Sequence, residues 1–401
     1  MLSLTSLSLL VLMGIIASVA RILVTSWRLR TIPGPFLARF TDVWRFWAMR
    51  SPHWSERLID LHNRHGYLVR LGPNHISISD PAAITTVYAT NPVWIKGPSY
   101  YAAATVSNGR TVPSIIAMDE TQHTAVRKSA GRAFTTNSLL DYEASIDSAT
   151  TELIDTISRH DKIDMATQLQ YFAMDVLMRI AFSESLGFIH KGSDVDGILA
   201  AVVARFDNWN AWAALPGLDY LWNKSALATK VIHRRRGDSP LARVSMAQLV
   251  ARQNQEHNPE GSKAIKKEGT QSKDLLQKFI DGQARYPELA VSNKHVLGIV
   301  MSTIGAGADT TAGTLAYTLY LLARHPQAAA MLQAELETAR EQGALAVPPR
   351  WTQVQHLPYL DAVLRESMRV LPIASWGLDR VVPPTGATIS GTFIPGGTVC
   401  R

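Results

Sequence analysis

The sequence contains a single cysteine, Cys400, among its 401 residues. One cysteine forms no disulfide within the chain and cannot supply a cysteine-based zinc site, so nothing in the sequence requires an oxidising compartment. Charged residues are also sparse, at 18%, whereas apolar residues make up 46%. This composition is typical of a globular or membrane-attached protein and not of a disordered one. The chain shows no internal repeat.

Nucleic acid is not an expected partner, although the net charge is +7. Two basic runs, His233–Arg236 and Lys263–Lys267, contribute to this charge. A basic face can meet anionic lipid, nucleic acid or an acidic protein. Neither run is interleaved with aromatic residues, and no nucleic-acid-binding motif is present. A solvated loop is the simpler interpretation of both runs.

Residues 1–24 are predicted to be a transmembrane anchor. Leu2–Ala20 carries no charged residue, and about 20 apolar residues span a bilayer. The basic residues that follow are Arg21, Arg28 and Arg30. Their position after the apolar run predicts a single pass with the body in the cytosol. The alternatives are a signal peptide, because Ser18–Ala20 loosely fits a cleavage site, and a buried helix.

The remaining chain is predicted to be a hinge followed by one mainly helical domain with a small β region. Residues 25–40 are basic and contain Pro-Gly-Pro, which indicates a stiff bend. Residues 41–401 form the domain. Its expected elements are strands at 68–71 and 75–79, mostly helices from 120 to 283, and short strands and turns at 389–399. The segment 95–117 lacks a clear period and is predicted to be a long loop.

Three tryptophans lie close together in the sequence, at Trp209, Trp212 and Trp222. They can line the entrance to a hydrophobic site, lie at a membrane surface, or pack in the core. The residue pattern alone leaves these three interpretations open.

A glycine-rich stretch, "GAGADTTAG", interrupts the long apolar helix predicted over 292–325. Each glycine inside a helix costs about 1 kcal/mol relative to alanine, so the stretch needs a reason. Missing side chains allow something to approach the backbone closely. Asp309 and Thr310 place an acid beside an alcohol, a pair that can relay protons to a ligand. The alternative is a close helix–helix crossing at small residues.

Two further pairs stand one helical turn apart. Glu366 and Arg369 occur in "RESMR", and taken alone they indicate an ordinary surface ion pair. His123 and Arg127 occur in "HTAVR" and share one helix face, where two donors can bind a carboxylate or a phosphate. A surface pair is again the simpler interpretation of this motif alone.

Together, in this order and spacing, the motifs resemble those of the cytochromes P450, haem-thiolate monooxygenases, in their membrane-anchored eukaryotic and fungal branch. The stretch from Ala306 to Thr311 resembles the family signature [AG]-G-x-[DE]-T-T on the long central helix. Glu366 and Arg369 fit E-x-x-R, and "HTAVR" fits [WH]-x-x-x-R. The similarity extends from the "IPGP" hinge to the "IPGGTV" turn near the last residue.

The resemblance implies a role for each matching residue. Ala306 and Gly307 would form an oxygen groove over the haem, and Asp309 and Thr310 would deliver protons. The residues that would meet the haem propionates are His123, Arg127 and Arg380. Glu366 and Arg369 would form a structural ion pair. The implied partners are a hydrophobic small-molecule substrate, NADPH–cytochrome P450 reductase and the endoplasmic reticulum membrane, in secondary metabolism.

One family element is absent from these 401 residues. The haem loop F-x-x-G-x-R-x-C-x-G does not occur, and Cys400 lacks the glycine-rich bend that would present it to iron. Cys400 is therefore not expected to be a metal ligand, and the fold is expected to be incomplete at its C-terminus. Two alternatives to a working monooxygenase follow: a non-catalytic truncated remnant, and a helical membrane receptor or carrier with accidental motif matches.

Overall fold

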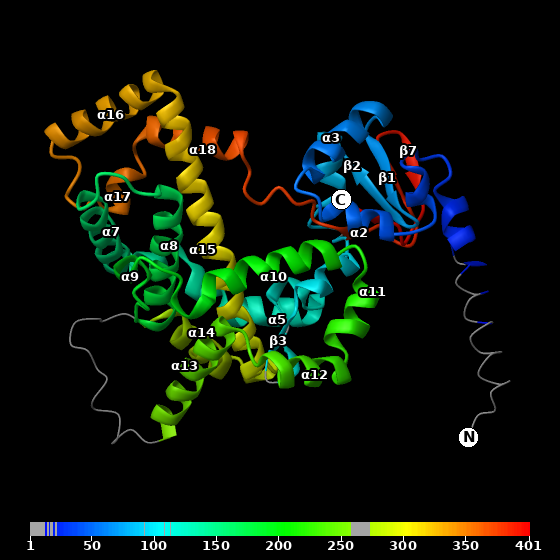
Figure 1. Ribbon diagram of the computed structural model, residues 1–401, viewed down its shortest axis with the longest axis horizontal. Coiled ribbons are helices and arrows are strands. Elements are labelled where there is room, and N and C mark those ends of the chain that lie inside the picture. Colours follow the sequence, from blue (N-terminus) through cyan, green and yellow to red (C-terminus); the bar gives the residue numbers. More distant parts are fainter. Residues whose placement is uncertain are drawn as a thin grey trace. The chain divides into compact units, whose positions relative to one another are not determined.

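The structure is a computed structural model. It describes residues 13, 16, 19, 20, 22–91, 93–107, 109–112, 114–257 and 273–401. The chain divides into two compact units. Unit 1 comprises Met1–Ala104, Ala204–Arg234 and Trp376–Arg401, and unit 2 comprises Thr105–Val203 and Arg235–Ser375. Figure 1 shows the helices and strands of both.

Unit 1 contains a four-stranded sheet with the order β1-β2-β8-β5. Its strands are β1 (Leu68–Gly72), β2 (His75–Ile78), β5 (Arg380–Val381) and β8 (Val399–Cys400). β1 and β2 are antiparallel, β8 runs parallel to β2, and β5 is antiparallel to β8. Blue strands from the start of the chain and red strands from its end therefore meet in one sheet (Figure 1).

Short helices and one hairpin complete unit 1. They are α2 (Val43–Met49), α3 (Trp54–His65), α4 (Ile84–Val87), α11 (Pro216–Asp219), most of α12 (Ala226–Arg236), and the hairpin β6 (Ala387–Ile389) and β7 (Thr392–Ile394). The core between hairpin and sheet includes Ile32, Ile76, Val382, Ile394 and Cys400. Burying such side chains contributes about 1.5–3 kcal/mol each relative to leaving them exposed.

The predicted hinge packs against β1. The backbone N–H of Arg70 donates to the carbonyl of Pro33 at 2.7 Å. A Cβ on Gly34 would lie 2.3 Å from the carbonyl oxygen of Arg70, so only glycine fits there. The Arg70 guanidinium is buried and donates to the carbonyls of Ser26, Leu29 and Pro73. The bonds to Ser26 and Leu29 hold the first part of the hinge against β1.

Two of the three neighbouring tryptophans pack inside unit 1. The ring of Trp209 lies 4.3 Å from that of Trp376, and its Nε1 donates to the Ser99 carbonyl at 3.2 Å. The ring of Trp212 lies 5.4 Å from that of Phe46. Trp222 is 72% exposed. Packing therefore explains the first two tryptophans and not the third.

Unit 2 is almost wholly helical. Its helices are α5 (Glu120–Ala130), α6 (Thr136–Leu140), α7 (Glu143–Ser158), α8 (Met165–Phe182), α9 (Phe188–Lys191), α13 (Pro240–His257), α14 (Leu275–Arg285), α15 (Asn293–Arg324), α16 (Pro326–Glu341), α17 (Trp351–Val354) and α18 (Pro358–Val370). α10 (Ile198–Trp212) begins in this unit and ends in unit 1. α15 is the central helix and packs against α8, α13, α14 and α18.

The expectation of a mainly helical chain with a small β region is confirmed, but the predicted long loop is wrong in detail. Residues 95–117 contain 3₁₀ helices at Pro98–Ala103 and Ile115–Ala117 and a hairpin of β3 (Thr105–Ser107) and β4 (Arg110–Val112). Gly109 turns the hairpin with a φ of 63°, a conformation that glycine adopts without strain.

Most of the predicted anchor, and the basic run Lys263–Lys267, lie outside the described residues. Among the residues that the structure describes, no helix combines the length and the apolar character that a membrane span needs.

Candidate functional site

α15 carries the predicted acid–alcohol pair on a helix that is continuous from Asn293 to Arg324. Ser292 and His295 form a capping box at its start, and His325-Pro326 ends it. The glycine-rich stretch stays helical because α15 is buried along much of its length against α8. Tertiary packing thus offsets the low helix propensity of the stretch.

Ala306, Asp309 and Thr310 share one face of α15, since they stand three and four residues apart. The Thr310 Oγ1 donates to the Ala306 carbonyl at 2.9 Å, which leaves its lone pairs available to accept another hydrogen bond. The Asp309 carboxylate makes no hydrogen bond or ion pair within the described part of the chain. It is half-buried. A role of the pair in proton delivery stays a prediction.

Two glycines of the stretch lie against neighbouring side chains. A Cβ on Gly307 would lie 3.0 Å from Cδ1 of Leu177 in α8, and one on Gly313 would lie 3.2 Å from Cδ1 of Ile373. Both contacts are tighter than ordinary van der Waals packing. Close packing of α15 thus accounts for these two glycines, and the oxygen groove at Ala306 and Gly307 stays a prediction.

α5 presents His123 and Arg127 one turn apart. Asp119 caps the helix by accepting from the Gln122 N–H at 2.9 Å. The Nδ1 of His123 lies 3.7 Å from a carboxylate oxygen of Glu120, and Arg127 is exposed. An imidazole and a guanidinium on one helix face are suited to a carboxylate. The contact of His123 and Arg127 with haem propionates stays a prediction.

Arg380 lies in β5 of unit 1, where two tyrosines orient it. Its Nη1 donates to the Tyr100 hydroxyl at 3.3 Å and to the Asp379 carbonyl at 3.0 Å. Its guanidinium carbon lies 5.3 Å from the ring centre of Tyr88, a cation–π contact. Burial raises the pKa of both tyrosines, so both hydroxyls stay protonated at neutral pH. The sequence patterns did not predict either tyrosine as a site residue.

Glu366 and Arg369 of α18 form a bidentate ion pair. Arg369 Nε and Nη2 each lie 2.7 Å from one carboxylate oxygen of Glu366. The hydrogen bond from Arg369 lowers the pKa of Glu366. Both side chains are exposed, at 59% and 71%, so solvent screens the pair. α18 packs against α15 in the same unit.

Cys400 lies in β8, paired with Ile76 on one side and Arg380 on the other. Its side chain is fully buried in the apolar core of unit 1. Burial, with a smaller contribution from Asp379, raises the pKa of its thiol to about 12. A buried thiol of this kind is a poor nucleophile and a poor metal ligand, because the thiolate is the binding form. That Cys400 is not a metal ligand stays a prediction.

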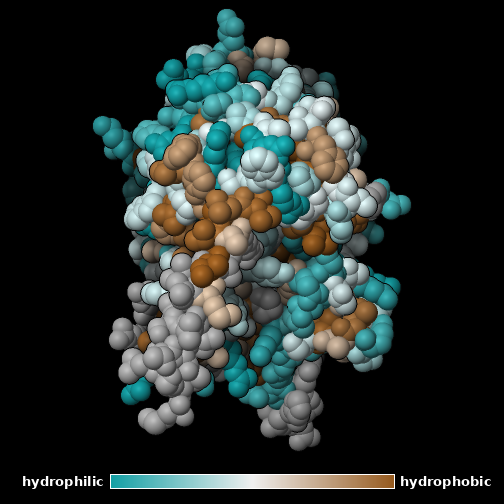
Figure 2. All heavy atoms as spheres, turned by 90° about the vertical axis from the view of Figure 1, so that its right-hand side faces the viewer, coloured by the Kyte–Doolittle hydropathy of each residue, from teal (hydrophilic) through white to brown (hydrophobic). Residues whose placement is uncertain are grey.

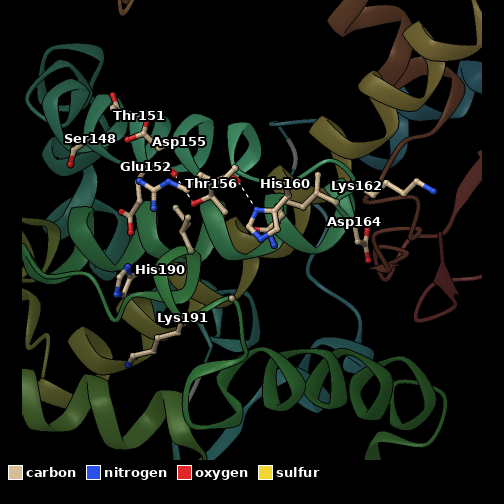
Figure 3. A pocket seen from close by; sticks show the side chains of 15 residues that line it. Ser148, Thr151, Glu152, Asp155, Thr156, His160, Lys162, Asp164, His190 and Lys191 are labelled. Carbon is tan, nitrogen blue, oxygen red and sulfur yellow. Dashed lines mark hydrogen bonds between the residues drawn. The ribbon is translucent and has the colours of Figure 1, made fainter.

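A polar cavity of about 700 Å³ opens in unit 2 between α7, the loop after it, and α9. Figure 3 shows Glu152, Asp155 and Thr156 on α7, with His190 and Lys191 on α9. The Nδ1 of His160 contacts the Thr156 carbonyl at 2.8 Å. The lining of the cavity is mostly polar, whereas small-molecule sites are mostly apolar. The cavity therefore does not suit a hydrophobic substrate.

The described residues include cationic side chains of the type that carboxylates need, on α5 in unit 2 and, separately, on β5 in unit 1. The one cysteine of the sequence is protonated and packed in a sheet. Among the described residues, no group of three histidine, cysteine or acidic side chains is arranged to hold a metal.

Comparison with known proteins adds an independent finding. The family model described as Cytochrome P450 matches residues 40–401. A cytochrome P450 monooxygenase of Aspergillus terreus is 33% identical over 380 residues, which cover 93% of this chain and 75% of that protein. A second, of Aspergillus flavus, is 32% identical over 403 residues, which cover 97% and 77%. A crystal structure of a cytochrome P450 matches with a TM-score of 0.65 at 19% identity, over 86% of this chain and 72% of that one.

Proposed function

Because the chain belongs to the cytochrome P450 family of haem-dependent monooxygenases, we propose that this protein oxidises a hydrophobic small molecule with dioxygen and electrons from NADPH–cytochrome P450 reductase. The observation that carries the proposal is the face of α15 that holds Ala306, Asp309 and Thr310. The relatives are fungal monooxygenases, which supports a substrate class typical of secondary metabolism. The family match favours an oxidoreductase over a receptor or carrier.

Proton delivery is the task of α15 in this proposal. Haem supplies the oxidising iron when it is bound. The Asp309 carboxyl is half-buried and unpaired within the described residues, so it can exchange protons with water and pass them to Thr310 Oγ1. The bond from Thr310 to the Ala306 carbonyl fixes the hydroxyl at 2.9 Å and orients its lone pairs. Each proton thus arrives at a defined atom.

Three cationic or titratable side chains hold the propionates in this proposal. His123 and Arg127 act from α5, and Arg380 acts from β5. Tyr100 and Tyr88 set the direction of the Arg380 guanidinium. A charged guanidinium with a fixed orientation loses little entropy when it binds a carboxylate.

A second candidate function applies to a polypeptide made of residues 1–401 alone, and the position of Cys400 favours it. With its thiol protonated in β8, this polypeptide holds no thiolate for the iron. Such a chain would be a non-catalytic member of the family. Both candidates predict the same contacts to the propionates.

We also propose that the body lies on the cytosolic face of the endoplasmic reticulum, held by the apolar run Leu2–Val24. Exposed apolar side chains of unit 1 support a membrane contact. They include Leu23, Val24, Trp27, Phe36, Leu37, Trp47, Leu221, Trp222 and Leu227. Figure 2 shows several groups of apolar side chains, in brown, among hydrophilic ones on the face that it draws. Tryptophans are enriched where proteins meet the headgroup layer. Protease digestion of microsomes tests the topology, because a body shielded from added protease would contradict it.

A chimera separates the two candidate functions. Residues 1–401 are continued into the C-terminal segment of the Aspergillus terreus relative, which supplies a cysteine loop. The chimera and the polypeptide 1–401 are each expressed with the reductase and a panel of hydrophobic compounds under ¹⁸O₂. We expect products carrying one ¹⁸O atom from the chimera alone. A folded, haem-loaded chimera without any such product would sink the monooxygenase proposal.

A further inference from the structure

The core of unit 1 holds a group of charged side chains that the proposed chemistry does not use. Its members are Asp42, Arg45, His75, Asp379 and Arg401. Arg45, His75 and Asp379 are at most 5% exposed. Asp42 and Arg45 come from the start of α2, His75 from β2, and Asp379 directly precedes β5. The group therefore joins three separate parts of unit 1.

Five buried polar atoms of this group make no hydrogen bond among the described residues, although one of them, Asp42 Oδ1, lies 3.1 Å from Nη2 of Arg45 in an ion pair. They are Asp42 Oδ1, Arg45 Nε, His75 Nε2, Asp379 Oδ1 and Arg401 Nη2. The Nε2 of His75 lies 3.7 Å from Oδ1 of Asp379. This separation is too long for a direct hydrogen bond and suits a bridging water. Since roughly 90% or more of buried polar atoms have a partner, His75 Nε2 and Asp379 Oδ1, which have no hydrogen bond, point to a ligand that bridges them.

Glycines make room for three members of the group. A Cβ on Gly72 would lie 2.2 Å from Asp42 Oδ1, and one on Gly97 would lie 2.7 Å from the Asp379 Cβ. A Cβ on Gly377 would lie 2.9 Å from the Arg401 Cβ. Any other residue at these positions would displace the charged side chains. The backbone thus encloses the group closely on several sides.

The mixture of donors and acceptors indicates which kind of ligand the group can bind. Arg45 and Arg401 offer donors, whereas Asp42 and Asp379 offer acceptors. Burial lowers the pKa of His75 well below its ordinary value, with Arg45 and Arg401 adding to the effect, so His75 is neutral. An anion would be repelled by the carboxylates, and a metal ion by the guanidinium groups. Water both donates and accepts and makes about three hydrogen bonds in such sites.

We propose that Asp42, Arg45, His75, Asp379 and Arg401 enclose an internal water-binding site in which water bridges His75 Nε2 to Asp379 Oδ1. The bridge holds the Asp379 carboxylate. The backbone carbonyl of the same residue accepts two further hydrogen bonds. The Asp379 carbonyl accepts from the Gly97 N–H at 3.1 Å and from Arg380 Nη1 at 3.0 Å. The water site thereby fixes the strand that carries Arg380. The role of Arg380 toward haem rests on the proposed function, but the water site does not.

A crystal structure of the full chain that resolves ordered water tests the site directly. We expect water within hydrogen-bond distance of both His75 Nε2 and Asp379 Oδ1. Direct contact between the side chains, with all five atoms paired to protein, would overturn the proposal. A bromide or manganese signal at the position in soaked crystals would also overturn it, because an ion would then be the ligand.

Paired variants test the bridge in solution. His75→Gln keeps a polar atom near Nε2, whereas His75→Leu removes it. We expect the Gly97 amide to exchange with deuterium about tenfold faster in His75→Leu, the change expected when a buried group loses its partner, and much less so in His75→Gln. His62→Leu is the matched control, since His62 bonds directly to Ser77 at 2.8 Å and lies outside the group. Equal exchange in both His75 variants would refute the bridge, independently of haem binding or activity.

Discussion

Replacing Cys400 with alanine should make the protein more resistant to alkaline unfolding. In the unfolded chain the thiol has an ordinary pKa of 9.0, and burial in the folded chain raises it to about 12. At pH 7 the thiol is protonated in both states. Above pH 9 the unfolded chain loses this proton while the folded chain keeps it, so the free energy of unfolding falls as the pH rises toward 12.

The size of the effect follows from the same two pKa values. At pH 10 the native protein should lose about 1.4 kcal/mol of stability through Cys400 alone, and the full window to pH 12 corresponds to about 4 kcal/mol. Cys400→Ala removes this loss. Alanine also leaves a small cavity in the core, but that cost is the same at both pH values and cancels in the comparison.

The free energy of unfolding is measured in urea for the native protein and for Cys400→Ala, each at pH 7 and at pH 10. The variant should gain about 1.4 kcal/mol relative to the native protein between the two pH values. Val399→Ala is the matched control, because it trims the same strand and has no titratable group. If the effect of Cys400→Ala is equal at both pH values, the thiol ionises freely, and Cys400 becomes available as a thiolate ligand.

Three further predictions concern unit 2. In a haem-loaded protein such as the chimera, Thr310→Ala should raise the peroxide released per NADPH consumed about tenfold while Thr311→Ala does not, because the proposal assigns proton delivery to the Thr310 hydroxyl. Equal peroxide yields from the two variants would remove Thr310 from proton delivery. Asp175→Ala should cost about 3 kcal/mol in urea unfolding, since its carboxylate accepts from Ser185, Gly187 and Ile189, whereas the exposed Asp161→Ala should cost almost nothing. Gly307→Val should lower the free energy of unfolding by about 1–3 kcal/mol, because valine overpacks against Leu177. Adding Leu177→Ala should relieve that cost. Additive effects of the two substitutions would show that the two positions do not touch.

The main helices and the first hairpin could be predicted from the sequence because their signals are local. Apolar periodicity and a proline at each boundary defined the helix at Pro358–Val370. The turn Gly72-Pro73-Asn74 separated β1 from β2. The hairpin at 105–112 was missed, although Asn108-Gly109 is a strong turn signal, because its strands are only three residues long.

The sequence predicted candidate site residues where motif and helix spacing coincide. For Asp309 and Thr310 the prediction rests on their neighbours in the helix and on a family signature. Tyr88 and Tyr100 could not be found in this way, because a sheet that joins both ends of the chain brings Arg380 to them. Pairing of β2 with β8 across more than 300 residues has no local signal. The same pairing encloses the buried group around His75.

The close packing at Gly307 illustrates a limit of motif reading. In the sequence, a glycine inside a helix indicates close approach but does not say what approaches. The structure places Leu177 of α8 there. The close helix crossing therefore describes part of the stretch, and the role of Ala306, Asp309 and Thr310, which share one partly exposed face, stays a prediction.

The claim that Cys400 is not the iron ligand is tested most directly by the carbon monoxide difference spectrum of the reduced polypeptide 1–401, recorded beside that of Cys400→Ser. We expect no thiolate-type Soret band from either protein, because the Cys400 thiol stays protonated and packed in β8. A strong thiolate-type band that disappears in Cys400→Ser would contradict the claim, since it would identify Cys400 as the iron ligand.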